Sequence, residues 1–141
     1  MRIMLQEKVK LYTDGGARGN PGPAAAGVVI KDSIGDLIES FGEFLGEITN
    51  NQAEYQALIL GLEHVKKIGA KEVEVFMDSE LIVNQLNRKF KVKNKDLASL
   101  FVKAWNLSLG FKKITYQHIR REQNKAADAE VNRVLDEHIN F

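Results

Sequence analysis

The chain has 141 residues, of which 44% are apolar, and its formal net charge is +1. This length predicts one domain over residues 1–141 with a buried core. The absence of cysteine excludes disulfides and thiolate metal sites, and it is compatible with a reducing cytoplasm. No uncharged apolar run reaches the roughly 18 residues of a membrane span, so we expect a cytoplasmic monomer without a membrane partner.

The first third of the chain predicts three strands joined by short links. A strand is expected over 8–14, followed by a loop over 15–23 that is dense in glycine and proline. Two further strands are expected over 24–31 and 37–45. Because short links join them, these three strands are expected to pair antiparallel.

The rest of the chain alternates helices with strands, which predicts an α/β fold with a five-stranded mixed sheet flanked by helices. A helix is expected over 51–68, with Asn50 or Asn51 as its cap. Strand-helix-strand connections are right-handed, so the last two strands should run parallel to the first. The other expected elements are a strand over 71–77, a helix from Ser79 to about 87, a helix over 95–109, a strand over 111–118 and a helix over 123–138.

Four acidic residues occupy positions that an ordinary fold avoids. Asp14 and Asp78 each close a strand-like run, and Glu54 and Asp128 each stand in line with the apolar stripe of a helix. Carboxylates in such places are costly unless they are paired, hydrogen-bonded or bound to cations. Singly, each has a plain alternative as a turn residue or as a charge that favours a helix N-terminus. Together they predict a site for hard divalent metals, the chemistry of phosphodiester cleavage.

The acids lie within segments of a recognisable order and spacing. These are Tyr12-Thr13-Asp14-Gly15-Gly16 with Gly19-Asn20-Pro21-Gly22, Thr49-Asn50-Asn51-Gln52-Ala53-Glu54, Asp78-Ser79, and Asn124-Lys125-Ala126-Ala127-Asp128. In them the chain resembles the type 1 ribonuclease H family, and the resemblance covers nearly the whole chain. It implies the ribonuclease H-like fold, which agrees with the element order above.

The resemblance also implies an activity, namely endonucleolytic hydrolysis of the RNA strand of an RNA–DNA hybrid to 5′-phosphate and 3′-hydroxyl ends. The cofactor would be two Mg²⁺ ions roughly 3.5–4 Å apart, with Mn²⁺ as a candidate substitute. The catalytic residues and metal ligands carried over from the family are Asp14, Glu54, Asp78 and Asp128.

Substrate contacts follow from the same resemblance. Asn20, Asn51 and Gln52 take the family's role of meeting the 2′-hydroxyls of the RNA strand. Thr49 and Asn94 match a pocket for a DNA phosphate. Turn and cap chemistry is the alternative role for these residues.

The chain departs from many bacterial members by lacking a basic helical protrusion. The corresponding interval is the run 88–95, which holds five cations in eight positions and no acid. Lys89 and Lys91 are therefore candidates for contacts to the DNA backbone, and a solvated face is the alternative.

A second departure concerns a mobile histidine that many members carry before the last acid. Counting back from Asp128 gives His118, but His118 also reads as the end of the last strand. If it is the strand end, the loop is shortened and Arg121 occupies the neighbourhood of the missing histidine. We favour this second alignment, because loops change length more readily than strands, and Arg121 is then an auxiliary catalytic residue.

Two other functions remain open from the sequence. A non-catalytic binder of hybrid or double-stranded RNA is disfavoured, because a binder has no need of four mutually repelling carboxylates. A nuclease for double-stranded RNA, or for single ribonucleotides in DNA, is not excluded, and double-stranded RNA is kept as a second candidate partner.

Overall fold

The computed structural model describes residues 7–139, apart from the side chain of Ile139. The ends of the predicted domain 1–141 thus lie outside the described residues. Among those described, no helix is both long and apolar enough to cross a membrane. The elements are β1 (Lys8–Ala17), β2 (Gly22–Asp32), β3 (Leu37–Ile48), α1 (Asn50–Lys67), β4 (Glu72–Met77), α2 (Glu80–Leu86), α3 (Lys95–Ser108), β5 (Lys113–His118), a 3₁₀ turn (Arg121–Gln123) and α4 (Lys125–Ile139).

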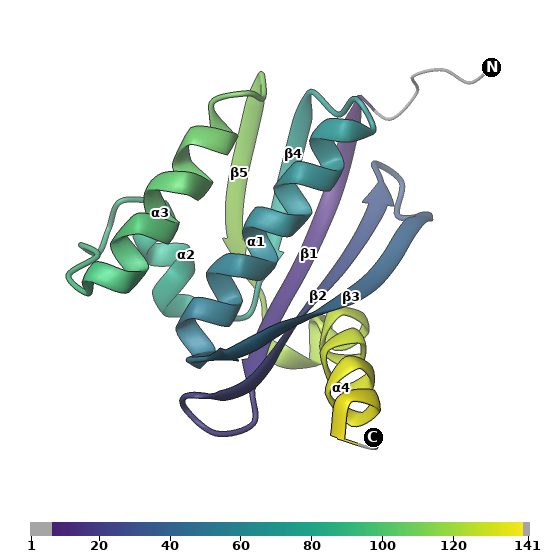
Figure 1. Ribbon diagram of the computed structural model, residues 1–141. Coiled ribbons are helices and arrows are strands. Elements are labelled where there is room, and N and C mark those ends of the chain that lie inside the picture. The colour runs from purple at the N-terminus through teal and green to yellow at the C-terminus, as the bar shows by residue number, and fades with distance from the viewer. Residues whose placement is uncertain (1–6, 140–141) are drawn as a thin grey trace.

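The five strands form one mixed sheet in the order β3-β2-β1-β4-β5 (Figure 1). β1 pairs antiparallel with β2, and β2 with β3. β4 runs parallel to β1, and β5 runs parallel to β4. This confirms the predicted mixed sheet, including the parallel direction of the last two strands.

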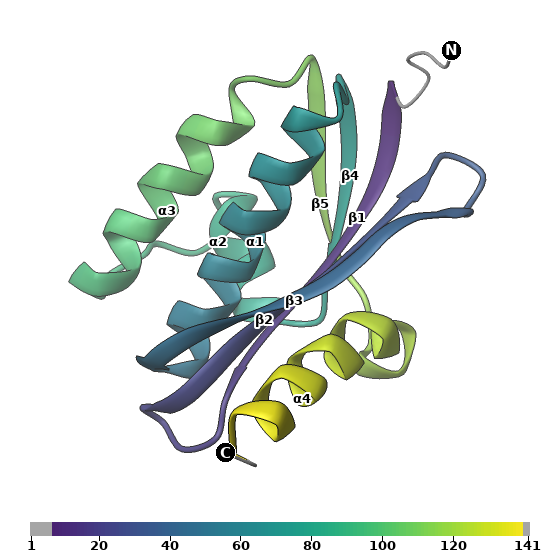
Figure 2. The ribbon, with the colours of Figure 1, turned by 45° about the vertical axis from the view of Figure 1, so that its right-hand side comes forward.

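The helices lie on the two faces of the sheet. Figure 2 shows α1, α2 and α3 on one face and α4 alone on the other, where it packs on β2 and β3. The main core fills the layer between the sheet and α1, with Leu11, Leu58 and Leu62 wholly buried. A smaller apolar cluster holds α4 to β2 through Ala25, Val131, Val134 and Leu135.

The predicted loop 15–23 is wrong at both ends. β1 continues to Ala17 and β2 begins at Gly22, so the loop is only residues 18–21. Gly15, Gly16 and Ala17 pair with Ala26, Ala25 and Ala24. Small residues make weak strands when they stand alone, but here a helix covers each face of the paired segment, and bulkier side chains would hold those helices away.

The predicted cap of the first helix is also wrong. Thr49, not Asn50 or Asn51, is the N-cap of α1, and its Oγ1 accepts a hydrogen bond from the Gln52 backbone N–H at 3.2 Å. The Gln52 Oε1 in turn accepts from the Thr49 backbone N–H at 2.9 Å. This reciprocal pair is a capping box, which the sequence carries as Thr49-x-x-Gln52.

Close contact between α1 and β1 depends on Gly15. A Cβ atom at Gly15 would lie 2.2 Å from the backbone C and O atoms of Ala53, which no side-chain rotation can relieve. At the next position, Gly16, a Cβ would lie 3.4 Å from a Val131 methyl group, an ordinary contact. The glycine at position 15 therefore sets how near the start of α1, with Glu54, comes to the sheet.

We expect Gly15→Ala to destabilise the protein by about 3 kcal/mol, because overpacking against immobile backbone forces elements apart. Gly16→Ala is the matched control in the same strand, with an expected change below about 1 kcal/mol. Urea unfolding followed by circular dichroism measures both, and equal midpoints for the two variants would contradict this account of the α1–β1 contact.

Candidate active site

Two of the predicted acids are brought together by strand register. The parallel pairing of β1 with β4 ends at Tyr12 and Phe76, whose rings stack at 4.8 Å between centroids. Asp14 and Asp78 each lie two residues beyond this last pair. The prediction that Asp14 ends its strand is wrong, because β1 runs on to Ala17. It nonetheless stands where β1 parts from β4, which places its carboxylate beside that of Asp78.

Glu54 approaches the same point from helix α1. Its Oε1 accepts a hydrogen bond from the backbone N–H of Gly15 at 3.1 Å, and the side chain is buried. Glu54 lies beyond the first turn of α1, which contains no acid. A favourable interaction with the helix dipole therefore does not explain the position of Glu54. The hydrogen bond to β1 explains it instead.

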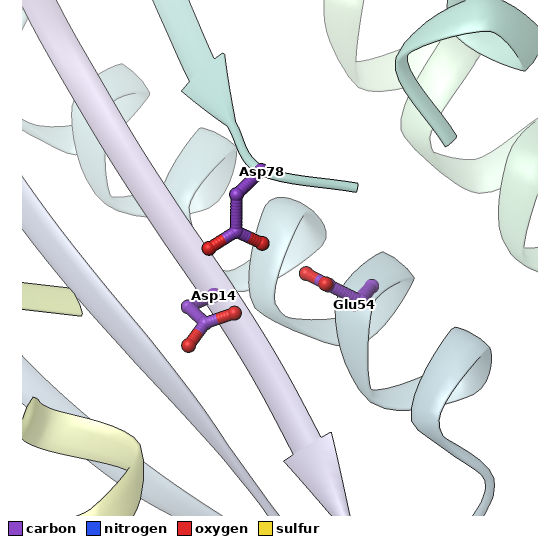
Figure 3. A group of neighbouring side chains, drawn as sticks. All are labelled: Asp14, Glu54 and Asp78. Atoms are coloured by element: carbon purple, nitrogen blue, oxygen red, sulfur yellow. The ribbon is translucent and has the colours of Figure 1, made fainter. Parts of the chain in front are cut away.

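The three carboxylates form a compact cluster, drawn in Figure 3. Asp14, Glu54 and Asp78 each offer a carboxylate oxygen, and these atoms lie within 4.8 Å of one another. The cluster opens into a pocket of about 430 Å³, named the acidic pocket below. Its lining comprises Asp14, Gly15, Gly16, Ala17, Arg18, Asn50, Glu54, Asp78, Arg121, Asp128, Val131, Asn132 and Leu135.

Asp128 contributes from the first turn of α4 on the other face of the sheet. It lines the acidic pocket, as predicted, but it lies outside the tight group of three oxygens. Its Oδ2 accepts from Asn132 Nδ2 at 3.3 Å, and its Oδ1 lies 3.8 Å from the Arg121 guanidinium. All four predicted acids thus line one pocket, with Asp128 on its edge.

The electrostatics of the pocket are unfavourable to a full set of charges. Burial, followed by repulsion from the neighbouring Asp78 and Asp128 carboxylates, raises the pKa of the Asp14 carboxyl to about 8, and the nearby Arg121 acts in the opposite sense. Burial and then repulsion from Asp14 raise the pKa of Glu54 well above its ordinary value. A cation placed among these oxygens would stabilise the ionised cluster.

The predicted substrate residues gather in a second pocket of about 390 Å³, named the amide pocket. Asn50 lines both this pocket and the acidic pocket, so the two adjoin. The lining of the amide pocket is Asn20, Thr49, Asn50, Asn51, Gln52, Asn94, Asp96 and Leu97.

The side-chain oxygens of the amide pocket serve the fold. Asn20 Oδ1 accepts from the Asn50 backbone N–H at 3.0 Å, and Asn94 Oδ1 accepts from Asp96 N–H at 2.8 Å as the cap of α3. Gln52 Oε1 belongs to the capping box. These residues therefore do have the turn and cap roles that the sequence offered as the alternative. They fix the orientation of these amides, and among the described residues their amide nitrogens donate no side-chain hydrogen bond.

The predicted cationic residues lie in two places. Arg121 lines the acidic pocket, with its side chain 81% exposed. Lys89 and Lys91 are exposed and line a separate groove with Phe90 between α2 and α3, next to Asn94 in the chain but away from the acids. His118 is the last residue of β5, pairs with Met77, and does not line the acidic pocket.

Comparison with known proteins adds independent evidence. The family model "Reverse transcriptase-like" matches residues 12–134. A bifunctional protein of Mycobacterium tuberculosis is 44% identical over 131 residues, covering 92% of this chain and 36% of its own length. The crystal structure of ribonuclease H1 from Halobacterium salinarum superposes with a TM-score of 0.91 at 40% identity, covering 92% of this chain and 98% of that one. The chain belongs to the type 1 ribonuclease H family.

A further solved structure in the family contains a nucleic acid. It is a ribonuclease H1 named LC11 in complex with an RNA/DNA hybrid, with a TM-score of 0.89, 45% identity, and coverage of 93% of this chain and 99% of that one. The present chain spans only 36% of the length of the mycobacterial relatives, so those proteins contain more than this ribonuclease H domain.

Sequence reasoning assigned no role in the site to four polar residues around the acids. Asn50 Oδ1 accepts from the Ala17 backbone N–H at 2.8 Å and joins the two pockets. Arg18 forms an ion pair with Asp136 on α4 at 2.7 Å at the far side of the acidic pocket. Asn124 is buried against Asp78. Asn50 and Asn124 stand in the motifs quoted above. Asn132 also had a readable signal, because it lies four residues after Asp128 on α4 and positions i and i+4 share a helix face.

Removal of one acid should stabilise the metal-free protein. In the unfolded chain the Asp14 carboxyl ionises near pH 4, and in the folded protein its pKa is raised to about 8. The folded state therefore holds a proton that the unfolded state has lost, so stability is full below about pH 4 and falls as pH rises to 8. We expect Asp14→Asn to gain about 1 kcal/mol or more at pH 8 and almost nothing at pH 4.

Mg²⁺ should raise the melting temperature of the unaltered protein at pH 8, since ligand binding to the folded state stabilises it, and should do so far less for Asp14→Asn. Thermal unfolding in EDTA and in Mg²⁺ measures both effects. Equal melting temperatures for the two proteins in EDTA at pH 8 would show that the cluster carries no repulsion.

Proposed function

We propose that this domain is a metal-dependent endoribonuclease that hydrolyses the RNA strand of RNA–DNA hybrids. The observation that carries the proposal is the meeting of three carboxylates within 4.8 Å of one another, beside the amide pocket. Asp14 on β1 and Glu54 on α1 are buried, and Asp78, directly after β4, is half-buried. A cluster of acids supports metal-assisted hydrolysis, and an adjoining set of oriented amides supports recognition of a polar backbone. The family's solved complex with an RNA/DNA hybrid supports the choice of substrate.

The donors of the acidic pocket fit a hard divalent cation. The four predicted ligands all offer carboxylate oxygens, which Mg²⁺ and Mn²⁺ prefer. Burial, and after it the neighbouring carboxylates, raise the pKa values of Asp14 and Glu54, and a bound cation would favour their ionised forms. We propose two Mg²⁺ ions, with Mn²⁺ as a substitute. The residues that would hold them are Asp14, Glu54, Asp78 and Asp128. When bound, the metal supplies Lewis acidity at the phosphate and lowers the pKa of water.

The chain's own groups bind and orient the substrate. Water attacks the phosphorus and the bond to the 3′-oxygen breaks, which leaves a 5′-phosphate and a 3′-hydroxyl. The Glu54 carboxylate is held in place before the reaction by the Gly15 N–H, and the Asp14 backbone is held within β1. The Arg121 guanidinium offsets negative charge on the phosphate from the edge of the pocket.

Discrimination between strands falls to the amide pocket. The amide nitrogens of Asn20 and Gln52 are oriented by the bonds that their oxygens make, and they are suited to donate to 2′-hydroxyls of the RNA strand. Asn51 shares this pocket. Thr49 and Asn94, which also line this pocket, would receive a phosphate of the DNA strand. Double-stranded RNA remains a second candidate substrate, because it too presents 2′-hydroxyls.

The decisive experiment compares three labelled duplexes. The purified protein is incubated with RNA–DNA hybrid, RNA duplex and DNA duplex in Mg²⁺, and products are resolved by length and by end group. Cleavage of only the RNA strand of the hybrid, with 5′-phosphate ends, is expected. Cleavage of RNA duplex at an equal rate would replace the proposed specificity, and no cleavage of any duplex would leave a binding protein.

Amide substitutions at the acids should nearly abolish that cleavage. Asp14→Asn, Glu54→Gln and Asp78→Asn each remove a metal-binding charge while keeping shape, and we expect turnover to fall by about 10³-fold or more. The circular dichroism spectrum should stay unchanged. A variant with near-normal turnover would remove that residue from the catalytic set.

Arg121→Ala should lower kcat by about 10-fold or more, the effect of losing one positioned charged donor. His118→Ala should cost less, and the pH profile should have no limb near the ordinary imidazole pKa of about 6.5. Arg120→Ala, an exposed neighbour that does not line the pocket, is the control. A large loss for His118→Ala with a small one for Arg121→Ala would restore the mobile-histidine alignment.

Neutralising Lys89, Lys91 and Lys93 together to Gln should raise KM, flatten its dependence on salt by about one unit of slope per lost phosphate contact, and leave kcat nearly unchanged. The steady-state assay at several salt concentrations measures this.

The matched control for the lysines is a triple change to Gln at the opposite end of the fold, at Lys66, Lys67 and Lys71, all exposed. If both triples alter KM and the salt slope equally, the run 88–95 is only a solvated face.

A further inference from the structure

Asn124 is a buried polar residue beside Asp78 that has no role in the reaction proposed above. It is 2% exposed and follows the 3₁₀ turn that carries Arg121. Its backbone N–H donates to the Arg121 carbonyl at 2.9 Å, and its carbonyl accepts from the Asp128 N–H at 3.1 Å. Its backbone therefore links Arg121 to the first turn of α4.

The Asn124 side chain reaches across to the sheet. Its Nδ2 donates to the Thr13 carbonyl at 3.0 Å and to Asp78 Oδ2 at 3.4 Å. Thr13 is the residue before Asp14, and it lies beyond the last pair between β1 and β4. One amide group thus connects the backbone that carries Asp14 with the carboxylate of Asp78, at the point where the two strands separate.

The side-chain oxygen of Asn124 makes no stabilising contact of this kind. Its Oδ1 is buried and has no hydrogen-bond partner among the described residues. An unpaired buried oxygen costs about 1–3 kcal/mol. A side chain selected for packing alone would avoid that cost, so the donor group must account for an amide here.

We propose that Asn124 is a positioning residue for the metal site: its amide group fixes the Asp78 carboxylate against β1, so that Asp78 faces Asp14 and Glu54 before any cation arrives. The two N–H bonds of one amide suit two acceptors at once. The hydrogen bond to Asp78 uses one lone pair of Oδ2 and leaves the other carboxylate lone pairs free to bind a cation. Hydrogen bonds that orient metal-binding carboxylates in this way tune metal affinity. This inference rests on the proposed function of the acidic pocket.

The test uses two substitutions of Asn124 and a control substitution on α4, the helix that follows it. Asn124→Ala removes the amide, and Asn124→Leu removes it while retaining the branched shape that fills the space. Val134→Ala is the control, because Val134 is buried in the cluster that holds α4 to β2 but does not line the acidic pocket. Thermal unfolding in EDTA shows how much each variant is destabilised, and binding is measured below the lowest melting temperature.

The first readout is the binding of Mn²⁺ alone, without nucleic acid, by titration calorimetry. We expect both Asn124 variants to bind Mn²⁺ at least about 10-fold more weakly than the unaltered protein, the usual effect of losing a residue that orients a ligand. Val134→Ala should bind Mn²⁺ with unchanged affinity even where its stability is lowered as much.

The second readout is the metal dependence of hybrid cleavage. For the Asn124 variants the Mg²⁺ concentration at half-maximal rate should rise by a similar factor, with KM for the hybrid unchanged. Unchanged Mn²⁺ affinity in either variant that folds, or an equal loss in Val134→Ala, overturns the positioning role. If the unaltered protein neither binds Mn²⁺ nor cleaves hybrid, the proposed function fails with it, whereas normal behaviour of both the unaltered protein and the Asn124 variants sinks this inference alone.

Discussion

The site depends on how closely two helices approach the strand pair from opposite faces. α1 approaches β1 at Gly15, and α4 approaches β2 at Gly27, where a Cβ would lie 2.1 Å from the Ala127 carbonyl oxygen. Glu54 follows the first of these contacts by one residue in the chain, and Asp128 follows the second. Close packing of backbone on backbone thus fixes two acids whose separation in sequence is large. Asp14 and Asp78 then lie between Glu54 and Asp128, at the point where β1 and β4 separate.

Repulsion among the clustered carboxylates destabilises this arrangement, and the same repulsion favours the binding of cations. Packing holds Asp14 and Glu54 where water is scarce and where like charges are near, so their pKa values rise. Such a cluster is poorly stable alone and becomes stable when cations enter, which links folding energy to metal binding. A polar frame around the acids keeps them in place, through the Gly15 N–H, Asn132 and Asn124.

Local sequence signals predicted the elements well wherever periodicity was strong. The capping residue of α2, Ser79, and the strand end at His118 are confirmed. The errors fall where tertiary contacts override local preference. Gly15 and Gly16 look like a turn, yet they pair with β2 because a helix covers each face. Thr49 is the N-cap of α1 in place of the two predicted asparagines, because it forms a capping box with Gln52.

The acids were found because carboxylates at apolar positions are conspicuous in a sequence. The distances between the acids could not be predicted from the sequence, because the register of β1 against β4 and the glycine contacts join segments far apart in the chain. Asn50 and Asn124 stand in the family motifs, but their site roles were missed for the same reason: each acts through side-chain hydrogen bonds to groups far away in the chain, which leave no periodic pattern. The roles of Lys89 and Lys91 stay predictions, since exposure alone does not separate a binding face from a solvated one.

The central claim is that the carboxylate cluster is a divalent-metal site. Anomalous diffraction at the manganese edge, from crystals of this protein grown with Mn²⁺, tests it most directly. The account predicts an anomalous peak in contact with the carboxylates of Asp14, Glu54 and Asp78, which disappears in crystals of the Asp14→Asn variant. A map with no peak among these residues, at Mn²⁺ concentrations that support cleavage, would contradict it.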